Sequence, residues 1–209
     1  MGTFTQLSGL CQRWWRVFDR YAVLNAFGAS ASALLLLLGS GYAVGYETQP
    51  QAQAQSIEVG FSPEGSAERL VEKTIDTAQR SIRLAAYSFT SPEVVRGLIN
   101  AKSRGVDVAV VADAKANISE GGKGTHALSA LVTAGIPVRV VSVYPIHHDK
   151  FIVTDGSNVQ TGSFNYSRAA AERNSENALL IRNNPDIAAR YLAHWQDRWA
   201  KGQDFNPRY

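Results

Sequence analysis

Six residues within a short stretch of the chain have the types and spacing needed for chemistry at a phosphate group. A histidine, a lysine and an aspartate are spaced as H-x-K-x4-D, and a G-S-x-N sequence follows: His148, Lys150, Asp155, Gly162, Ser163 and Asn165. An imidazole can act as a nucleophile or as a general acid and base, and an ammonium group can neutralise an oxyanion. A hydroxyl and an amide can add hydrogen bonds to the same oxygens. The pattern therefore predicts an active site directed at phosphate.

Two adjacent histidines precede the lysine, and the expected local structure distinguishes them. The segment Ile146–Thr154 is predicted to be a strand, and a strand turns alternate side chains to opposite faces. His148 and Lys150 then project together, whereas His147 projects to the other side. This alternation singles out His148 as the functional histidine.

The same alternation separates the remaining polar residues of the motif. Ser163 and Asn165 share one face, so both are expected to contribute hydrogen bonds to the bound phosphate. Asp155 has the opposite parity to His148, and it begins an Asp-Gly turn signal. We therefore expect Asp155 to support the site or organise the turn rather than to contact the phosphate directly.

The elements that must position these residues follow the pattern of an α/β domain, in which short β-rich runs alternate with amphipathic stretches of helical period. Strands are predicted at Ser56–Phe61, Ile82–Phe89, Val106–Ala112, Val138–Val143, Ile146–Thr154 and Val159–Thr161. Helices are predicted at Glu64–Gln79, Ser91–Ser103, Lys123–Ala134 and Pro185–Lys201. Trp195 and Trp199 fall on the helical spacing of the last helix and are expected in the core.

In these residues the chain resembles the phospholipase D superfamily, which is defined by the H-x-K-x4-D motif, and especially its small bacterial Nuc-type endonucleases. The segment TGSFNYSRAAAERNSENALLIRN and the ending HWQDRW are similar to that subgroup, and the likeness covers Ser56–Gly202. The G-S-x-N spacing, in place of the G-S-x-x-N of many lipid-cleaving relatives, favours a nuclease. The resemblance implies a phospholipase D-like domain with a mixed, largely parallel sheet flanked by helices.

The resemblance also implies a mechanism with two histidines, one attacking phosphorus to give a phosphohistidine and the other protonating the leaving oxygen. In-line displacement needs these groups on opposite sides of phosphorus, so one imidazole cannot serve both. This chain has a single H-x-K, because no lysine follows two residues after the other histidines, which are His126, His147 and His194. A homodimer that shares one site is therefore expected.

Glu176 matches the family position whose carboxylate orients the catalytic imidazole, although a solvated glutamate at the start of a strand is the alternative. No metal and no other cofactor is expected, because no cluster of acidic residues or histidines with metal-ligand spacing accompanies the motif. Cys11 is the only cysteine, which excludes an intrachain disulfide and a thiolate metal cluster.

The amino-terminal part of the chain predicts export. A basic region over 1–20 precedes an uncharged, apolar segment over 21–46 that exceeds the about 20 residues needed to cross a bilayer. A low-complexity linker over 47–55 leads to the catalytic domain over 56–209. The arginines lie before the apolar segment and Glu47 lies after it, so the domain is expected outside the cytoplasm, periplasmic or secreted. Cleavage as a signal peptide and retention as an anchor both remain open.

Three functions fit these observations. The leading hypothesis is a metal-independent phosphodiesterase that acts as a sequence-nonspecific endonuclease on DNA, with RNA left open. A phospholipase D that cleaves phospholipid head groups is the alternative, favoured by the membrane-directed amino terminus. A non-enzymatic, membrane-tethered DNA-binding module is the third. The part of the chain after Gln55 carries 18 basic and 16 acidic residues, and this net charge of +2 is too small to indicate nucleic acid binding by itself.

Overall fold

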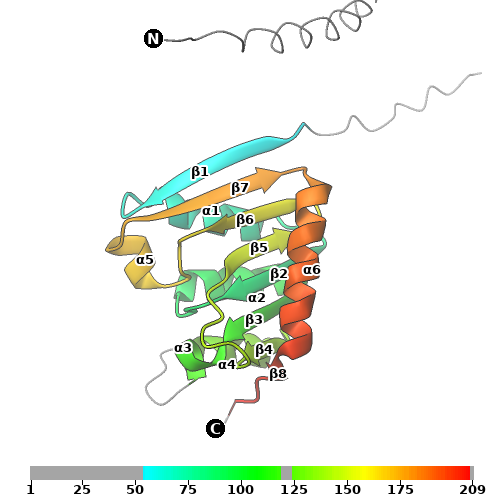
Figure 1. Ribbon diagram of the computed structural model, residues 1–209. Coiled ribbons are helices and arrows are strands. Elements are labelled where there is room, and N and C mark those ends of the chain that lie inside the picture. Colours follow the sequence, from blue (N-terminus) through cyan, green and yellow to red (C-terminus); the bar gives the residue numbers. More distant parts are fainter. Residues whose placement is uncertain (1–53, 119–123, 208–209) are drawn as a thin grey trace, which may run out of the picture. The chain divides into compact units, whose positions relative to one another are not determined.

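One mixed sheet of eight strands forms the centre of the described part of the chain (Figure 1). The computed structural model describes residues 54–118 and 124–207. The strand order across the sheet is β1-β7-β6-β5-β2-β3-β4-β8. The strands are β1 (Ser56–Ser62), β2 (Ser81–Ala86), β3 (Asp107–Asp113), β4 (Val138–Val141), β5 (Lys150–Thr154), β6 (Asn158–Gly162), β7 (Glu176–Arg182) and β8 (Gln203–Asp204).

The predicted α/β domain with a mixed sheet is confirmed, but the prediction that the sheet is largely parallel is wrong. Only β2–β3 and β3–β4 are parallel pairs, and the connections between those strands contain helices. The pairs β1–β7, β7–β6, β6–β5, β5–β2 and β4–β8 are antiparallel. β5 and β6 are joined by a short turn, and a connection of that length permits only an antiparallel pair.

Helices cover both faces of the sheet (Figure 1). One face carries α1 (Ser66–Asp76), α2 (Pro92–Ser103), α4 (Thr125–Thr133) and the short α5 (Arg168–Glu172), and the other carries α6 (Pro185–Lys201). A short helix, α3 (Ala114–Ile118), follows β3. The predicted bounds of α6 are those observed, because Asn184 caps the first turn through the Ile187 amide and Pro185 occupies the first position.

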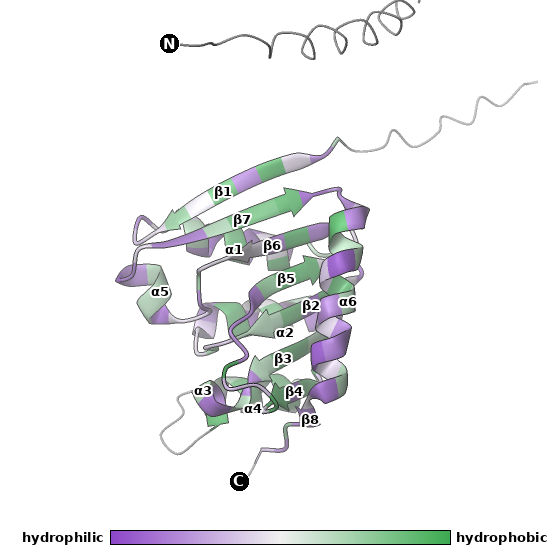
Figure 2. Cartoon of the chain, viewed as in Figure 1, coloured by the Kyte–Doolittle hydropathy of each residue, from purple (hydrophilic) through white to green (hydrophobic). Residues whose placement is uncertain are grey.

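Two hydrophobic cores lie on the two faces of the sheet, and successive residues of a strand contribute their side chains alternately to one core and to the other. Leu84 of β2 packs with α1 and α2, whereas Ala85 packs with α6. Trp195 of α6 is buried, and its indole nitrogen donates a hydrogen bond of 2.9 Å to the Leu84 carbonyl oxygen. Its ring stacks on Trp199 at 4.8 Å, so the predicted core role of Trp195 is confirmed. Hydrophilic residues follow the outer face of α6 (Figure 2).

The strand β1 leaves one of its faces exposed. Its alternate residues Ile57, Val59 and Phe61 are all more than half exposed. In the register of the sheet, Ile57 pairs with Ile181 and Val59 pairs with Leu179. Opposed residues of antiparallel strands point to the same face, so these side chains extend an apolar surface from β7 to the edge of the sheet.

The predicted strand over Ile146–Thr154 is too long by four residues, since β5 begins at Lys150. Lys150 pairs with Ala86, the last residue of β2, so the residues before it have no neighbouring strand. The backbone amide of His147 donates instead to a carboxylate oxygen of Asp113 at 2.7 Å. His148 therefore lies on a loop that leads into the strand.

The predicted amino-terminal segments over 1–20 and 21–46, and most of the linker over 47–55, lie outside the described residues. Within 54–118 and 124–207, no helix combines the length and the apolar character needed to cross a membrane. The first strand, β1, begins at Ser56, where the catalytic domain is predicted to begin.

Candidate active site

The residues of the sequence motif other than Asp155 gather at one edge of the sheet, where neighbouring antiparallel strands start and end. Lys150 begins β5, Gly162 ends β6 and Glu176 begins β7. The pairing of Phe151 with Thr161 and of Gly162 with Ala178 brings these three strand ends together. The edge thus collects an ammonium group, a carboxylate and the G-S-x-N loop.

Tyr87, which follows β2, contacts both principal groups of the motif. Its ring lies 4.5 Å from the His148 ring, and the Lys150 Nζ lies 5.1 Å from the Tyr87 ring centroid. The Lys150 Nζ also donates a hydrogen bond of 2.9 Å to the His148 carbonyl oxygen. No sequence signal indicates this role of Tyr87, because the residue falls inside the predicted strand over Ile82–Phe89, whereas β2 ends at Ala86.

Lys150 is almost completely covered, with 7% of its surface exposed, whereas His148 is exposed. Burial lowers the pKa of the Lys150 ammonium group, and the negative charges of Glu176 and Asp149 partly offset this effect. A buried cation of this kind gains from an anion that enters the site, because the anion replaces lost hydration.

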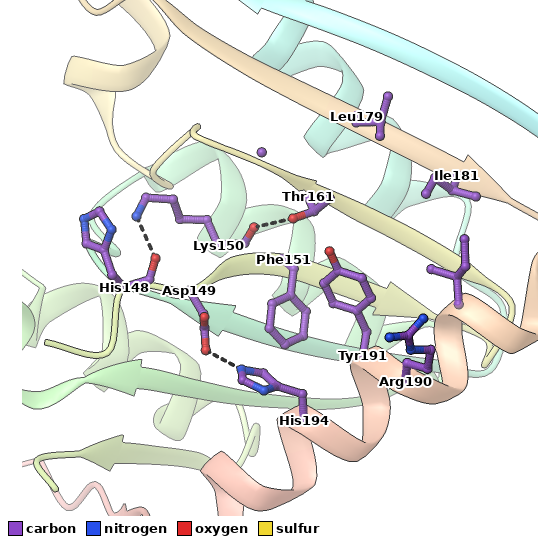
Figure 3. Close-up of a pocket in the computed structure, with 12 residues that line it drawn as sticks. His148, Asp149, Lys150, Phe151, Thr161, Leu179, Ile181, Arg190, Tyr191 and His194 are labelled. Atoms are coloured by element: carbon purple, nitrogen blue, oxygen red, sulfur yellow. Dashed lines mark hydrogen bonds and ion pairs between the residues drawn. The ribbon is translucent and has the colours of Figure 1, made fainter. Parts of the chain in front are cut away.

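Asp149, between the two motif residues, links the motif to α6. Its Oδ2 accepts hydrogen bonds from the Nε2 atoms of His147 at 3.0 Å and of His194 at 2.8 Å. Burial alone would raise the pKa of Asp149, but these two hydrogen bonds outweigh it and lower the pKa to about 2. The carboxylate is therefore ionised at neutral pH and fixes the loop of His148 against the helix (Figure 3).

The other three histidines are placed differently from His148. The side chain of His147 is only 1% exposed, so it is inaccessible to a substrate. His194 is partly exposed and lines the same pocket as His148, but from α6. His126 lies on α4, on the opposite face of the sheet.

The G-S-x-N loop is held by Asn177 of β7. The Ser163 backbone amide donates to the Asn177 carbonyl oxygen at 3.1 Å, and the Asn177 backbone amide donates to Ser163 Oγ at 3.1 Å. A Cβ atom at Gly162 would lie 2.2 Å from the Asn177 carbonyl oxygen, so only glycine fits there. Asn165 carries a buried Oδ1 without a hydrogen-bond partner among the described residues.

Glu176 lies at the same end of the strands as Lys150, whereas Asp155 lies at the other end. Glu176 accepts a hydrogen bond of 2.9 Å from Asn174 and acts on Lys150 through its charge, and among the described residues it makes no hydrogen bond to His148. Asp155 follows the far end of β5, about 16 Å along the strand from Lys150. Its carboxylate accepts hydrogen bonds from the backbone amides of Gln79, Arg80 and Ser81 at 2.7 to 3.2 Å.

A pocket of about 750 Å³ runs from the motif along the face of the sheet that carries α6 (Figure 3). His148 and Lys150 lie at one end. The floor is formed by Phe151, Thr161, Gly162, Leu179 and Ile181, and the wall of α6 contributes Ile187, Arg190, Tyr191 and His194. Within the described ranges, no group of three or more histidine, cysteine or acidic side chains is placed to hold a metal ion.

An exposed imidazole beside a buried ammonium group, at the mouth of such a pocket in an α/β domain, is an arrangement suited to attack on a phosphodiester. A family model described as "Cardiolipin synthase, PLD-like domain" matches residues 71–199. The chain belongs to the phospholipase D superfamily.

Individual relatives agree with this assignment. The solved structure of Nuc from Salmonella typhimurium, a phospholipase D family member, is 48% identical, with a TM-score of 0.71, and covers 73% of this chain and 99% of its own. A phospholipase D from Rickettsia conorii is 35% identical over 140 residues, 67% of this chain and 68% of the relative. A mitochondrial cardiolipin hydrolase from Xenopus tropicalis is 33% identical over 130 residues, 62% of this chain and 58% of the relative.

Proposed function

We infer that this phosphodiester hydrolase is an exported endonuclease that cleaves DNA without sequence specificity and without a metal ion. The observation that carries the proposal is the pairing of an exposed His148 with a buried Lys150 at the mouth of the pocket. The 48% identity to Nuc over nearly the whole of that chain supports the nuclease subgroup over the lipid-cleaving ones.

In the proposed reaction, a nitrogen of His148 attacks phosphorus, and the bond from phosphorus to the leaving oxygen breaks. A second, protonated imidazole gives its proton to that oxygen. Water then attacks the phosphohistidine, the second imidazole takes up the proton of the water, and the bond between nitrogen and phosphorus breaks. Lys150 neutralises the nonbridging oxygens, and Ser163 and Asn165 add hydrogen bonds.

A second copy of the chain supplies the second imidazole in this proposal. His147 is buried, and His194 lies on α6 and is bonded to Asp149, so neither replaces it at the motif. Val143 and Ile146, in the loop that leads to His148, are 59% and 54% exposed. Apolar side chains beside a half-complete site support an isologous contact that places the partner's His148 opposite this one.

The proposal is tested with the purified full chain and plasmid DNA in excess chelator. Cleavage is expected to continue, and His148→Asn is expected to lower kcat by at least a thousandfold because it removes the nucleophile. His126→Asn serves as the matched control, since it changes an exposed histidine on the opposite face of the sheet. Cleavage that stops on chelation, or that survives in His148→Asn, would contradict the mechanism.

Phospholipid hydrolysis is the second candidate function. The pocket is lined partly by the apolar side chains of Leu179, Ile181 and Ile187, which suit an acyl chain as well as a nucleoside. Relatives named phospholipase D and mitochondrial cardiolipin hydrolase add support. Release of head groups from phospholipid vesicles, compared with plasmid nicking by the same preparation, separates the two functions.

Export remains part of the proposal and rests on the apolar segment over 21–46, which follows a basic region. Fractionation of cells that produce the full chain is expected to place it in the periplasm, the membrane or the medium. Recovery of all the protein from the cytoplasm would exclude export.

A further inference from the structure

Two polar groups on α6 face the pocket without a partner in the described part of the chain. The guanidinium group of Arg190 makes no hydrogen bond or ion pair with any described residue, although it lines the pocket. The hydroxyl group of the neighbouring Tyr191 makes no hydrogen bond with a described residue either. Other cations of the same helix differ, because Arg198 and Lys201 are both paired with Asp197. Arg190 is therefore available to an anion from outside the protein.

The helix that carries Arg190 is fixed relative to the motif. Tyr191 packs against Phe151 of β5 with the ring centroids 5.0 Å apart, in an edge-to-face arrangement. One turn further along, His194 is bonded to Asp149, the residue between His148 and Lys150. The Tyr191 ring and the backbone of α6 at Arg190 are thus held in a constant relation to the motif, and the Arg190 side chain extends from that fixed position into the pocket (Figure 3).

The pocket is too long for a single phosphate group. The floor runs from Lys150 along three residues of β5 to the level of Val153, and then across β6 and β7 to Ile181. Val153 of β5 pairs with Val159 of β6, and Val159 pairs with Ile181 of β7. With the rise and spacing of strands, this path spans about 14 Å. The phosphates of one DNA strand advance about 3.4 Å per nucleotide along the helix axis and are farther apart than that in space, so a strand laid along this path places more than one phosphate in the pocket.

We propose that Arg190, assisted by the Tyr191 hydroxyl, forms a second phosphate subsite that binds a phosphate next to the scissile one in a polynucleotide. The subsite rests on the proposed nuclease function, and it distinguishes a polyanionic substrate from one with a single phosphodiester. Lys150 binds the reacting phosphate and Arg190 holds a neighbouring one. The chain between them crosses the apolar floor at Leu179.

The test compares two substrates with the full-length protein: a single-stranded DNA oligonucleotide and bis(p-nitrophenyl) phosphate, which has one phosphate only. For Arg190→Ala, the ratio of kcat/KM for the oligonucleotide to kcat/KM for the small diester is expected to fall about three- to tenfold. Tyr191→Phe should lower the ratio less. Arg96→Ala, which removes a charge from α2 on the opposite face, should leave the ratio unchanged.

Salt dependence gives an independent readout. Between about 50 and 200 mM salt, the logarithm of oligonucleotide affinity should fall less steeply for Arg190→Ala, by about 0.7 in slope, because one phosphate contact is lost. An unchanged ratio and slope would overturn the subsite, and so would an equal loss with both substrates. An Arg190 effect seen only with anionic phospholipid vesicles would also overturn it.

Failure of the proposed function itself has a separate signature, which is that the unaltered protein cleaves neither substrate. Oligonucleotide binding by the His148→Asn protein, followed by fluorescence anisotropy, then decides about the subsite without any turnover. Weaker binding with a lower salt slope on adding Arg190→Ala supports the subsite, and identical binding curves exclude it.

Discussion

Lys150 is positioned before any substrate arrives. Its ammonium group donates a hydrogen bond to the His148 carbonyl oxygen, lies over the Tyr87 ring and interacts electrostatically with the Glu176 carboxylate. Such a cation needs little rearrangement when a phosphate binds, and preorganised charge of this kind lowers the barrier to reaction. Asp149 has the complementary role, because it holds the loop of His148 and Lys150 against His194 of α6.

Asp149 is expected to give the protein an acid-dependent stability. Its pKa is lowered from 3.8 to about 2, so the ionised carboxylate stabilises the fold above about pH 4 and this stabilisation is lost as the pH falls towards 2. The free energy at stake is about 2 kcal/mol. Urea unfolding at about pH 5 and pH 3 should show a smaller pH effect for Asp149→Asn than for the unaltered protein.

The control for this measurement is Asp76→Asn, which changes an exposed carboxylate at the end of α1. It should leave the pH dependence as in the unaltered protein. Parallel pH dependence in Asp149→Asn and the unaltered protein would show that the bonds to His147 and His194 do not lower the pKa of the carboxylate.

At the scale of elements, the turn between β5 and β6 shows what a motif aspartate can do away from the phosphate. Asp155 adopts a left-handed backbone conformation with φ of 57° and accepts three backbone amides at the start of β2. The turn thus ties the β5–β6 hairpin to the strand beside it. This placement follows from the length of β5, which separates Asp155 from Lys150.

Asp155→Ala is expected to lower the free energy of unfolding by about 2 kcal/mol, because charged hydrogen bonds are lost and alanine disfavours a positive φ. Asp155→Asn should cost less, since asparagine tolerates that conformation and keeps an acceptor oxygen. Chemical denaturation of both variants measures the difference. Equal stability of the alanine and asparagine variants would show that neither the positive φ nor the acceptor oxygen at position 155 contributes to the free energy of unfolding.

Many of the helices and strands are predictable from local sequence signals. The contacts that could not be predicted join residues far apart in the sequence. The bounds of α6 follow from its cap, its first proline and its periodicity, and β3 and β6 follow from their composition. The bond between Asp149 and His194 joins residues 45 positions apart, and no local pattern reports it. Tyr87 likewise reaches the site only through the pairing of β2 with β5.

At the scale of the whole molecule, the proposed dimer has one shared site that needs both copies of His148. The chain alone presents one exposed imidazole at the motif, together with apolar side chains at Val143 and Ile146 beside it. A site of this kind is completed by association, so activity and oligomeric state are linked.

Mixing the unaltered chain with His148→Asn and allowing subunits to exchange tests this linkage. A mixed dimer has one imidazole and is expected to be inactive, so activity should follow the square of the unaltered fraction. An equal mixture should retain about a quarter of the activity, whereas independent sites would retain about half. Ile146→Asp should give monomers in sedimentation and lose activity in parallel, and an active monomer would exclude the shared site.

The pairing of β1 with β7 sets the order in which the domain can be completed. Ser56 of β1 pairs with Arg182 of β7. During synthesis, β1 therefore has no neighbouring strand until β7 has been made. Until then the apolar residues Ile57, Val59 and Phe61 have no strand to align with, and loop closure over such a separation is slow. The β1 edge of the sheet therefore stays incomplete until the chain has been synthesised through β7, which ends at Arg182.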